Sequence, residues 1–240
     1  MRIEVWSDVV CPFCYIGKRE LEAALADFEH ADKVEVVYRS FELDPEAATT
    51  GEPLVEHLTS KYSMTPEQVT SQNDQLAARA ADVGLEFNWQ QARTSNTLDA
   101  HRLVKLAETE GLAAQATERL MNAYFTDAEV VSEHDTLVRV GTEIGLDAER
   151  VRAMLGTTEY AEDVRADQQQ AMGYGIQGVP FFLFEGQWAV SGAQPAEMFS
   201  EALQTVWDET TRPQLITIGE EFSGGGGGSC GCGGCGCGAK

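Results

Sequence analysis

Two cysteines separated by a proline and a phenylalanine carry the clearest chemistry of this chain. Cys11-Pro12-Phe13-Cys14 follows an apolar strand pattern and precedes a helical one. The nucleophile of disulfide exchange is a thiolate, and a helix N-terminus, with about half a positive charge and unpaired N–H groups, stabilises it. Pro12 suits the first helical turn because its missing N–H would have no partner there. We therefore predict that Cys11 is the exposed attacking thiol and that Cys14 is the protected resolving thiol.

A cysteine pair with two intervening residues is also the commonest half of a zinc site. The second half is normally a further pair a short way downstream, whereas the next cysteine after Cys14 is Cys230. The position of the pair directly after a first strand also favours redox chemistry. His30, His57 and His134 have no companions at ligand spacing, and we predict that they are surface residues.

A second signal is Pro180, which stands directly before a strand pattern. Only about 5–6% of X–Pro bonds are cis, so Pro180 alone would be read as a trans proline that opens an edge strand. Together with the cysteine pair, it favours a cis-proline loop in which the exposed backbone of Val179 binds an extended substrate segment. We assign Val179 and Pro180 to substrate binding, with Pro12 and Phe13. We expect the apolar residues after Pro180 to lie mainly in the core. As a secondary expectation, Phe182 and Trp188 line part of a substrate groove.

Four further cysteines crowd the last eleven residues of the chain and are separated by glycines. Glycine permits the positive φ angles with which a short loop wraps a soft ion such as Zn²⁺ or Cu(I), although a single intervening residue is atypical of tetrahedral zinc. The same thiols could instead relay electrons to a Cys11–Cys14 disulfide, or have no specific role. We leave these three uses open and expect no cofactor for the core reaction. The four residues are Cys230, Cys232, Cys235 and Cys237.

The elements that must position these residues follow an α/β order. Apolar alternation predicts a first strand, the spacing after the cysteines predicts a helix, and Val36 and Val37 suggest a second strand that is parallel and buried. A long helical block follows, then a helix, a β-hairpin with a turn at residues 185–187, and a last amphipathic helix. The predicted ranges are 2–7 for the first strand, 34–41 for the second, 53–156 for the helical block, and 180–184 and 188–190 for the hairpin.

Composition limits the possible partners and location. With 43% hydrophobic residues in 240, the chain suits one large globular domain or a domain with an insertion. The net charge of −22 repels phosphate backbones and anionic lipid, so we expect neither nucleic acid nor membranes as partners. No apolar run approaches the ~20 residues of a spanning helix, and the N-terminus lacks the pattern of a signal peptide. We therefore expect a cytoplasmic location.

Five segments of the chain resemble the FrnE-like branch of the DsbA-like thioredoxin family. The resemblance extends over about residues 1–212 and keeps these segments in order. It implies a thioredoxin fold with a large all-helical insertion, in which Cys11 and Cys14 are the redox pair and Val179-Pro180 is the cis-proline loop. The segments are residues 7–17, 41–45, 96–97 with 100–103, 175–182 and 191–194.

The residue patterns and the resemblance together predict four parts of the chain. Residues 1–52 and 157–212 form the two parts of an α/β thioredoxin fold, residues 53–156 are the helical insertion, and residues 213–240 are a flexible Gly/Cys-rich tail. We expect a thiol–disulfide oxidoreductase, either a reductase or an isomerase, that acts on dithiols and disulfides of other proteins. A low-molecular-weight thiol or a reductase would recycle it.

Two other functions remain as alternatives. One is a metal-binding or metal-delivery protein that uses the tail. The other is a glutathione-linked isomerase similar to 2-hydroxychromene-2-carboxylate isomerase, whose relatives have serine where this chain has Cys11. The stretch from Asn96 to His101 looks alike in both branches. We interpret Asn96 or Thr97 as a helix N-cap. We interpret His101 as a residue that packs at the domain junction, and a direct catalytic role near the Cys11 thiolate is the less favoured alternative.

Overall fold

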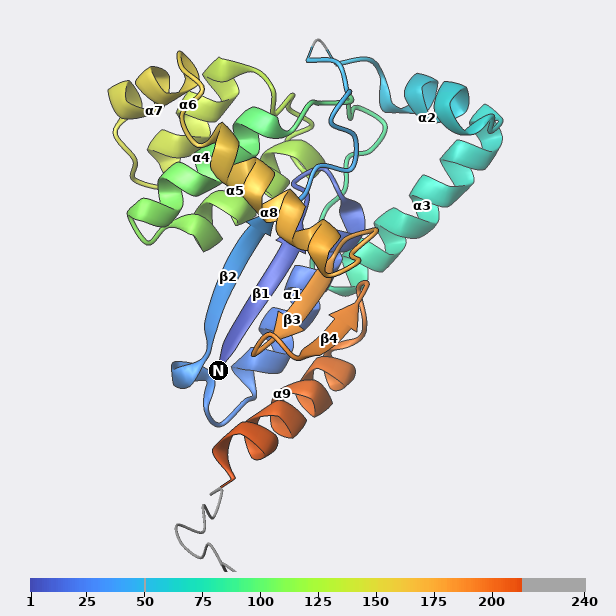
Figure 1. Cartoon of the computed structure of the whole chain (residues 1–240). Helices are drawn as coiled ribbons and strands as arrows, with labels where there is room; N and C mark the ends of the chain where they lie inside the picture. Colours follow the sequence, from blue (N-terminus) through green and yellow to red (C-terminus); the bar gives the residue numbers. More distant parts are fainter. Residues whose placement is uncertain (50, 213–240) are drawn as a thin grey trace, which may run out of the picture.

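The computed structural model describes residues 1–49 and 51–212. Its centre is a four-stranded mixed sheet with the strand order β2-β1-β3-β4 (Figure 1). The first strand, β1 (Arg2–Ser7), pairs in parallel with β2 (Glu35–Ser40) and antiparallel with β3 (Phe181–Phe184). The last strand, β4 (Trp188–Ser191), pairs antiparallel with β3. The sheet is that of a thioredoxin fold, as the resemblance implies.

The predicted hairpin is present between β3 and β4. Phe184 lies opposite Trp188, and the N–H of Gln187 donates to the carbonyl of Phe184 at 3.0 Å. Glu185 and Gly186, at the centre of the turn, both have positive φ angles, of 49° and 66°. Such angles match the twist of the two strands, and glycine adopts them at no steric cost.

The second strand is less buried than predicted. Val36 and Val37 are only partly buried. The parallel pairing of β2 with β1 is confirmed, but β2 is an edge strand of the sheet, so one of its sides has no neighbouring strand. An apolar run of this kind does not distinguish an edge strand from a central one.

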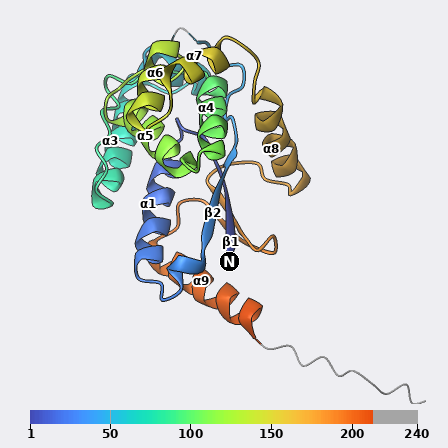
Figure 2. The same cartoon turned by 90° about the vertical axis from the view of Figure 1, so that its left-hand side faces the viewer.

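Helices cover both faces of the sheet. Two of them, α1 (Pro12–Ala26) and α9 (Ala196–Thr211), share a core with one face, where Leu21, Phe182 and Phe199 are buried. A third, α8 (Ala161–Gly173), lies on the opposite face (Figure 2). There the indole N–H of Trp6 donates to the carbonyl of Asp167 at 3.0 Å.

Six helices follow β2 and pack at the end of the sheet where β1 and β2 finish (Figure 1). The last five of them share one large core, whereas the first contributes no buried residue to it. No helix of the described ranges is both long and apolar enough to cross a membrane. Because the cysteine pair follows β1, it lies between the sheet and this helical block. The six are α2 (Leu54–Tyr62), α3 (Pro66–Asp82), α4 (Leu98–Thr109), α5 (Ala113–Phe125), α6 (His134–Glu143) and α7 (Ala148–Leu155), and a short 3₁₀ turn (Ala31–Lys33) precedes β2.

Candidate functional site

The cysteine pair occupies the first turn of α1. Cys11 is the N-cap residue, and Pro12 is the first residue of the helix. The carbonyl of Cys11 accepts hydrogen bonds from the N–H groups of Cys14 and Tyr15 at 3.0 and 3.3 Å. The N–H of Cys11 donates to the carbonyl of Asp8 at 3.1 Å, which closes the turn between β1 and α1. Both cysteines are free thiols.

Both thiols are buried, so the prediction of an exposed Cys11 is wrong. Cys11 is 3% exposed and Cys14 is 2% exposed. The helical block closes over the end of the sheet and takes Cys11 into its core, against which Val179 and Ala193 also pack. The exposed residue of the turn is instead Phe13, at 44%.

Burial also sets the protonation of the second cysteine. It raises the pKa of the Cys14 thiol well above its ordinary value, and the side chain of Cys11 raises it further. Hydrogen bonding from the backbone of Asp8 and the side chain of Ser7 acts in the opposite direction and is outweighed. Cys14 is therefore a neutral thiol at neutral pH.

The loop before β3 lies beside the first cysteine. The Sγ atom of Cys11 is 3.7 Å from the carbonyl oxygen of Val179, and the Val179–Pro180 peptide bond is cis. Gly17 in α1 allows this loop to approach, because a Cβ atom there would lie 3.1 Å from the Cγ of Pro180. The structure thus places Val179 and Pro180 next to Cys11, and their role in substrate binding stays a prediction.

A groove of about 640 Å³ opens next to the cysteine turn. It lies between this turn and the helical block, and its lining is largely apolar, with Arg79 as the only charged residue among the described residues that line it. Phe182 is completely buried in the core, and Trp188 of β4 does not line this groove. The secondary expectation that these two residues line a substrate groove is therefore wrong for the groove next to the cysteines. The lining residues are Val10, Pro12, Phe13, Leu43, Leu54, Leu58, Tyr62, Gln72, Asn73, Gln75, Leu76, Arg79, Phe87, Trp89, Ala92, Tyr124 and Phe125.

Arg79 connects α3 to the two segments that flank Cys11. Its guanidinium lies 5.6 Å from the ring centroid of Phe13, and its Nη2 donates to the carbonyl of Ala193 at 2.6 Å. The sequence contains no signal for this role of Arg79, since nothing in the helical pattern of α3 separates it from other surface arginines.

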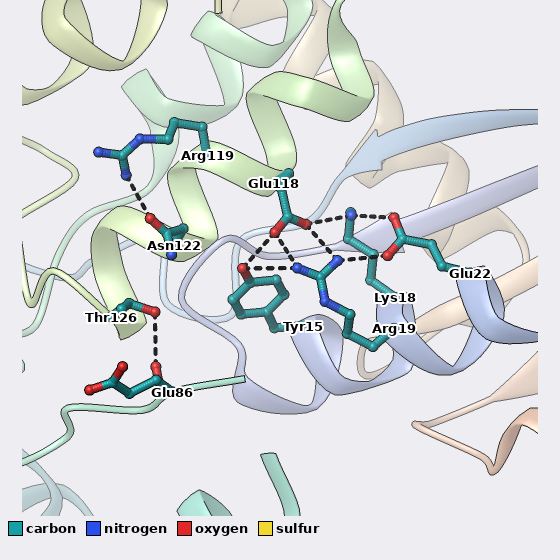
Figure 3. Close-up of polar contacts among 9 residues, drawn as sticks. All are labelled: Tyr15, Lys18, Arg19, Glu22, Glu86, Glu118, Arg119, Asn122 and Thr126. Carbon is teal, nitrogen blue, oxygen red and sulfur yellow. Dashed lines mark hydrogen bonds and ion pairs between the residues drawn. The ribbon is translucent and has the colours of Figure 1, made fainter. Parts of the chain in front are cut away.

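A charged network fixes α1 to α5 (Figure 3). Glu118 of α5 accepts hydrogen bonds from the Tyr15 hydroxyl at 2.7 Å, from the Lys18 ammonium at 2.5 Å and from Arg19. Glu22 accepts from Lys18 and Arg19 on its own helix. Burial acts to raise the pKa of Glu118, but the hydrogen bonds from Arg19, Lys18 and Tyr15 outweigh it and lower that pKa. The sequence contains no signal for this contact, because its partners are about a hundred residues apart.

His101 lies at the junction of α4 with the turn after β1. Its Nε2 is 3.3 Å from Oδ1 of Asp8, and Oδ2 of Asp8 accepts the N–H of Leu43 at 2.8 Å. Asp8 and His101 are 1% and 3% exposed. Both residues predicted as the N-cap of α4 take part in it. Thr97 is the N-cap residue, and Oδ1 of Asn96 accepts the N–H of Leu98.

Within the part of the chain that the structure describes, no three His, Cys, Asp or Glu side chains gather in a group that could hold a metal ion. Of the three histidines predicted at the surface, His134 is exposed, whereas His30 and His57 are partly buried. The ring of His30 stacks on Trp207. The tail cysteines proposed as a relay or metal site, Cys230, Cys232, Cys235 and Cys237, lie outside the described residues.

Comparison with known proteins gives consistent results. Residues 2–204 match the family described as the DSBA-like thioredoxin domain. The crystal structure of a probable DsbA oxidoreductase, SCO1869 from Streptomyces coelicolor, is similar with a TM-score of 0.85 and 44% identity, over 90% of this chain and 94% of that one. The uncharacterized protein YwbO of Bacillus subtilis is 27% identical over 209 residues, which are 85% of this chain and 96% of YwbO.

A more distant structure shares the fold. It is that of 2-hydroxychromene-2-carboxylate isomerase, with a TM-score of 0.65 and 14% identity, over 88% of this chain and 98% of the isomerase. At 14% identity, the similarity shows the fold alone, that is, the arrangement of the sheet and the helical block.

Proposed function

We propose that this chain, which belongs to the DsbA-like thioredoxin domain family, is a thiol–disulfide oxidoreductase that reduces or rearranges disulfides of other proteins. The observation that carries this proposal is the position of Cys11 at the start of α1, 3.7 Å from the carbonyl of Val179 and beside an apolar groove. Cys14 stands one turn further along the same helix.

The first step is an attack by Cys11 on a client disulfide. A bond forms between the Cys11 sulfur and one client sulfur, the client disulfide breaks, and the other client sulfur leaves as a thiolate that takes up a proton. The positive end of the α1 dipole lies at Cys11 and favours negative charge on its sulfur. The product is a mixed disulfide.

The second step releases the client. The sulfur of Cys14 attacks that of Cys11, a Cys11–Cys14 disulfide forms, and the second client sulfur leaves as a thiolate. The client gains two electrons and the cysteine pair loses them. If a client thiolate instead breaks a second client disulfide, and the thiolate released there attacks the client sulfur that is bonded to Cys11, Cys11 leaves as a thiolate. The client is then rearranged with no net gain of electrons, which is isomerase activity.

The surroundings of Cys11 support a protein client. Within the described residues, the backbone N–H of Val179 donates to no protein acceptor, so it is available for strand addition by an extended segment. Phe13, Leu43 and Tyr62, which are exposed at 44%, 48% and 60%, surround the apolar groove next to this position. Exposed apolar groups beside a concave site are typical of binding surfaces.

Recycling of the oxidised pair requires an external donor of two electrons. A low-molecular-weight thiol or a reductase would attack the Cys11–Cys14 disulfide by the reverse of the same chemistry. The reduction potential of the pair, measured against a glutathione buffer, separates a reductase, expected near the potential of thioredoxin, from an isomerase, which is expected to be more oxidising.

The proposal is tested with three proteins in which the four tail cysteines are replaced by serine: the otherwise native chain, Cys11→Ser and Cys14→Ser. Reduction of insulin should require both cysteines. Cys14→Ser should accumulate a mixed disulfide with insulin that is visible on a non-reducing gel, whereas Cys11→Ser should form none. Turnover by Cys14→Ser at the native rate would contradict the resolving role. Glutathione-dependent isomerisation that survives in Cys11→Ser would support the isomerase alternative.

A further inference from the structure

A small cavity lies at the junction between the sheet and the helical block. Its volume is about 10 Å³, which is close to the space that one water molecule needs. Strands β1 and β2 contribute Ser7 and Ser40 to its wall, and helices α4 and α5 contribute His101 and Thr117. The cavity is therefore a place at which elements from both parts of the fold meet.

One hydroxyl group in the wall of this cavity lacks a protein partner. Thr117 of α5 is 3% exposed. Its Oγ1 atom forms no hydrogen bond within residues 1–49 and 51–212, and it is the only buried side-chain nitrogen or oxygen of these residues that forms none. A buried hydroxyl without a hydrogen bond is costly, and nearly all such groups in folded proteins pair with protein atoms or with ordered water. The hydroxyl of Thr117 thus points to a ligand in the cavity.

The wall of the cavity is polar. Six of its eight described residues have a side chain that can donate or accept a hydrogen bond, and the other two are valines. Cavities that stay empty in proteins are lined by apolar groups, whereas buried water is found where polar groups offer it about three hydrogen bonds. The size and the lining of this cavity both suit one water molecule. The six polar residues are Ser7, Tyr38, Arg39, Ser40, His101 and Thr117.

Protein partners already occupy some of these polar groups. The guanidinium of Arg39 donates to the carboxylate of Glu4 at 2.8 Å. The Nε2 atom of His101 faces Oδ1 of Asp8 at 3.3 Å, which leaves Nδ1 of the same ring for a second partner. His101 is 3% exposed, so bulk solvent has little access to that nitrogen. Thr117 and His101 are thus two buried groups, on different helices, that a single water molecule can join.

We propose that one water molecule is bound in this cavity as a fixed part of the protein, where it joins Thr117 of α5 to His101 of α4 and to Ser7 of β1. The Thr117 hydroxyl donates to the water oxygen. The two water hydrogens are donated to Nδ1 of His101 and to the hydroxyl oxygen of Ser7. The Nε2–H of His101 then donates to Asp8. This water belongs to the packing of the helical block on the sheet and takes no part in the thiol exchange.

The position of the water links the helical block to the strand that leads to the cysteines. Ser7 is the last residue of β1, and Val9, which also lines the cavity, lies two residues before Cys11. A water molecule that bridges two protein groups is nearly as favourable as a direct hydrogen bond and costs little entropy. The bound water therefore holds α4 and α5 against the end of the sheet at which the cysteine turn begins.

Thr117→Val tests for the water through the sign of its effect, because valine has nearly the shape of threonine but lacks the hydroxyl. With a bound water, the variant loses one hydrogen bond, and the equilibrium constant for unfolding in urea should rise about 2- to 10-fold. A hydroxyl without any partner would instead make valine the better residue, and the constant would fall. A fall would overturn the inference.

A double-mutant cycle shows whether the hydrogen bond of Thr117 passes through the cavity. Thr117→Val and Ser7→Ala each remove a partner of the same water, so the double variant should be at least about twofold more stable than the product of the single effects predicts. Thr142→Val is the matched control, because the Thr142 hydroxyl donates to the carbonyl of Val138 on its own helix at 2.8 Å. Its effect should multiply with that of Ser7→Ala. The same independence for Thr117 and Ser7 would show that no water bridges them.

A crystal structure of the full-length protein gives the direct observation. Density for a water molecule is expected within hydrogen-bonding distance of Thr117 Oγ1 and His101 Nδ1, and it should be weaker or absent in Thr117→Val. A cavity without such density in the native protein, or a Thr117 hydroxyl that donates to a backbone carbonyl of α5, would contradict the proposal. If Thr117→Val does not fold, the native crystal structure decides alone.

Discussion

The guanidinium group of Arg79 lies 5.6 Å from the ring centroid of Phe13, and so joins α3 of the helical block to the residue that follows Pro12 in the cysteine turn. The same side chain donates a hydrogen bond to the carbonyl of Ala193. Arg79 therefore holds three segments together around a buried Cys11.

Replacement of Arg79 by alanine should make Cys11 more accessible. A cation–π contact and a hydrogen bond together contribute about 1–2 kcal/mol, which corresponds to roughly a 5- to 30-fold change in an opening equilibrium. The rate at which iodoacetamide alkylates Cys11 should rise by that factor, measured by mass spectrometry in the Cys14→Ser protein without tail cysteines. Arg165→Ala is the control, since Arg165 is exposed and, within residues 1–49 and 51–212, pairs with Glu162 alone, on its own helix. Equal alkylation rates in both variants would show that Arg79 does not restrict access.

Gly17→Ala should destabilise the protein although it lies within a helix. Alanine is favoured over glycine in helices by about 1 kcal/mol. A Cβ at this position, however, would lie 3.1 Å from Pro180, 3.2 Å from Phe182 and 3.4 Å from the Cα of Ala193. Overpacking of this kind costs about 1–3 kcal/mol, so the net loss should be roughly 0–2 kcal/mol in urea unfolding.

Insulin reduction should also fall in Gly17→Ala, because the loop of Pro180 must move away from α1. Gly173→Ala is the matched control, since a Cβ there would meet nothing within 4 Å. That variant should gain up to about 1 kcal/mol and keep full activity. A stabilised and fully active Gly17→Ala protein would mean that the approach of the loop to α1 is unimportant.

Glu118→Gln should lower stability at neutral pH and much less at acidic pH. The carboxylate accepts hydrogen bonds from Lys18, whose side chain is 6% exposed, and from Tyr15 and Arg19. Loss of its charge should cost about 1–3 kcal/mol at pH 7, with Glu22 left as a partner of Lys18.

The pH dependence of this loss follows from the lowered pKa of Glu118. Its contribution to folding is complete above the ordinary value of 4.5 and disappears as the pH falls through the lower folded value. The free energies of unfolding of Glu118→Gln and the native protein should therefore converge as the pH falls below the lowered folded pKa of Glu118. Glu149→Gln, at a surface pair with Arg152, should change stability by less than about 0.5 kcal/mol at either pH. A difference that persists at low pH would assign the effect to packing rather than charge.

Deletion of residues 224–240 should leave the melting temperature nearly unchanged. A segment of glycine, serine and cysteine can bury too little apolar surface to offset the entropy of ordering it. Attack of Cys11 on small disulfides should also survive, because Cys11 and Cys14 suffice for the exchange.

If the tail is a relay, the deletion should slow the reduction of the Cys11–Cys14 disulfide, since a tether gives the tail thiols an effective concentration of about millimolar. Peptide mapping of the full-length Cys14→Ser protein should then find Cys11 joined to one of Cys230, Cys232, Cys235 or Cys237. Stoichiometric zinc or copper on these four thiols, with Cys11 found only on external clients, would replace the relay with a metal site.

The sequence by itself determined the order of elements and the place of the cysteine pair at the start of α1. These elements follow from local patterns, which local backbone preferences translate directly into structure. Examples are the apolar alternation in β1, the hairpin turn at Gly186 and the apolar spacing in α1. The pair Cys11 and Cys14 could be found in the same way, because the helix that carries them starts within the motif. These parts needed no knowledge of distant contacts.

Only the tertiary structure decided what surrounds that pair. The position at which the helical block packs against the sheet decides several features. These are the burial of Cys11, the edge position of β2, and the contacts of Glu118, Arg79 and His101. Such contacts join residues that are 35 to 128 positions apart, for example Asp8 with Leu43 and Arg39 with Asp167, and they form when apolar cores are packed together. Packing has no period along the chain, so the sequence predicts which thiol attacks but not the environment that surrounds it.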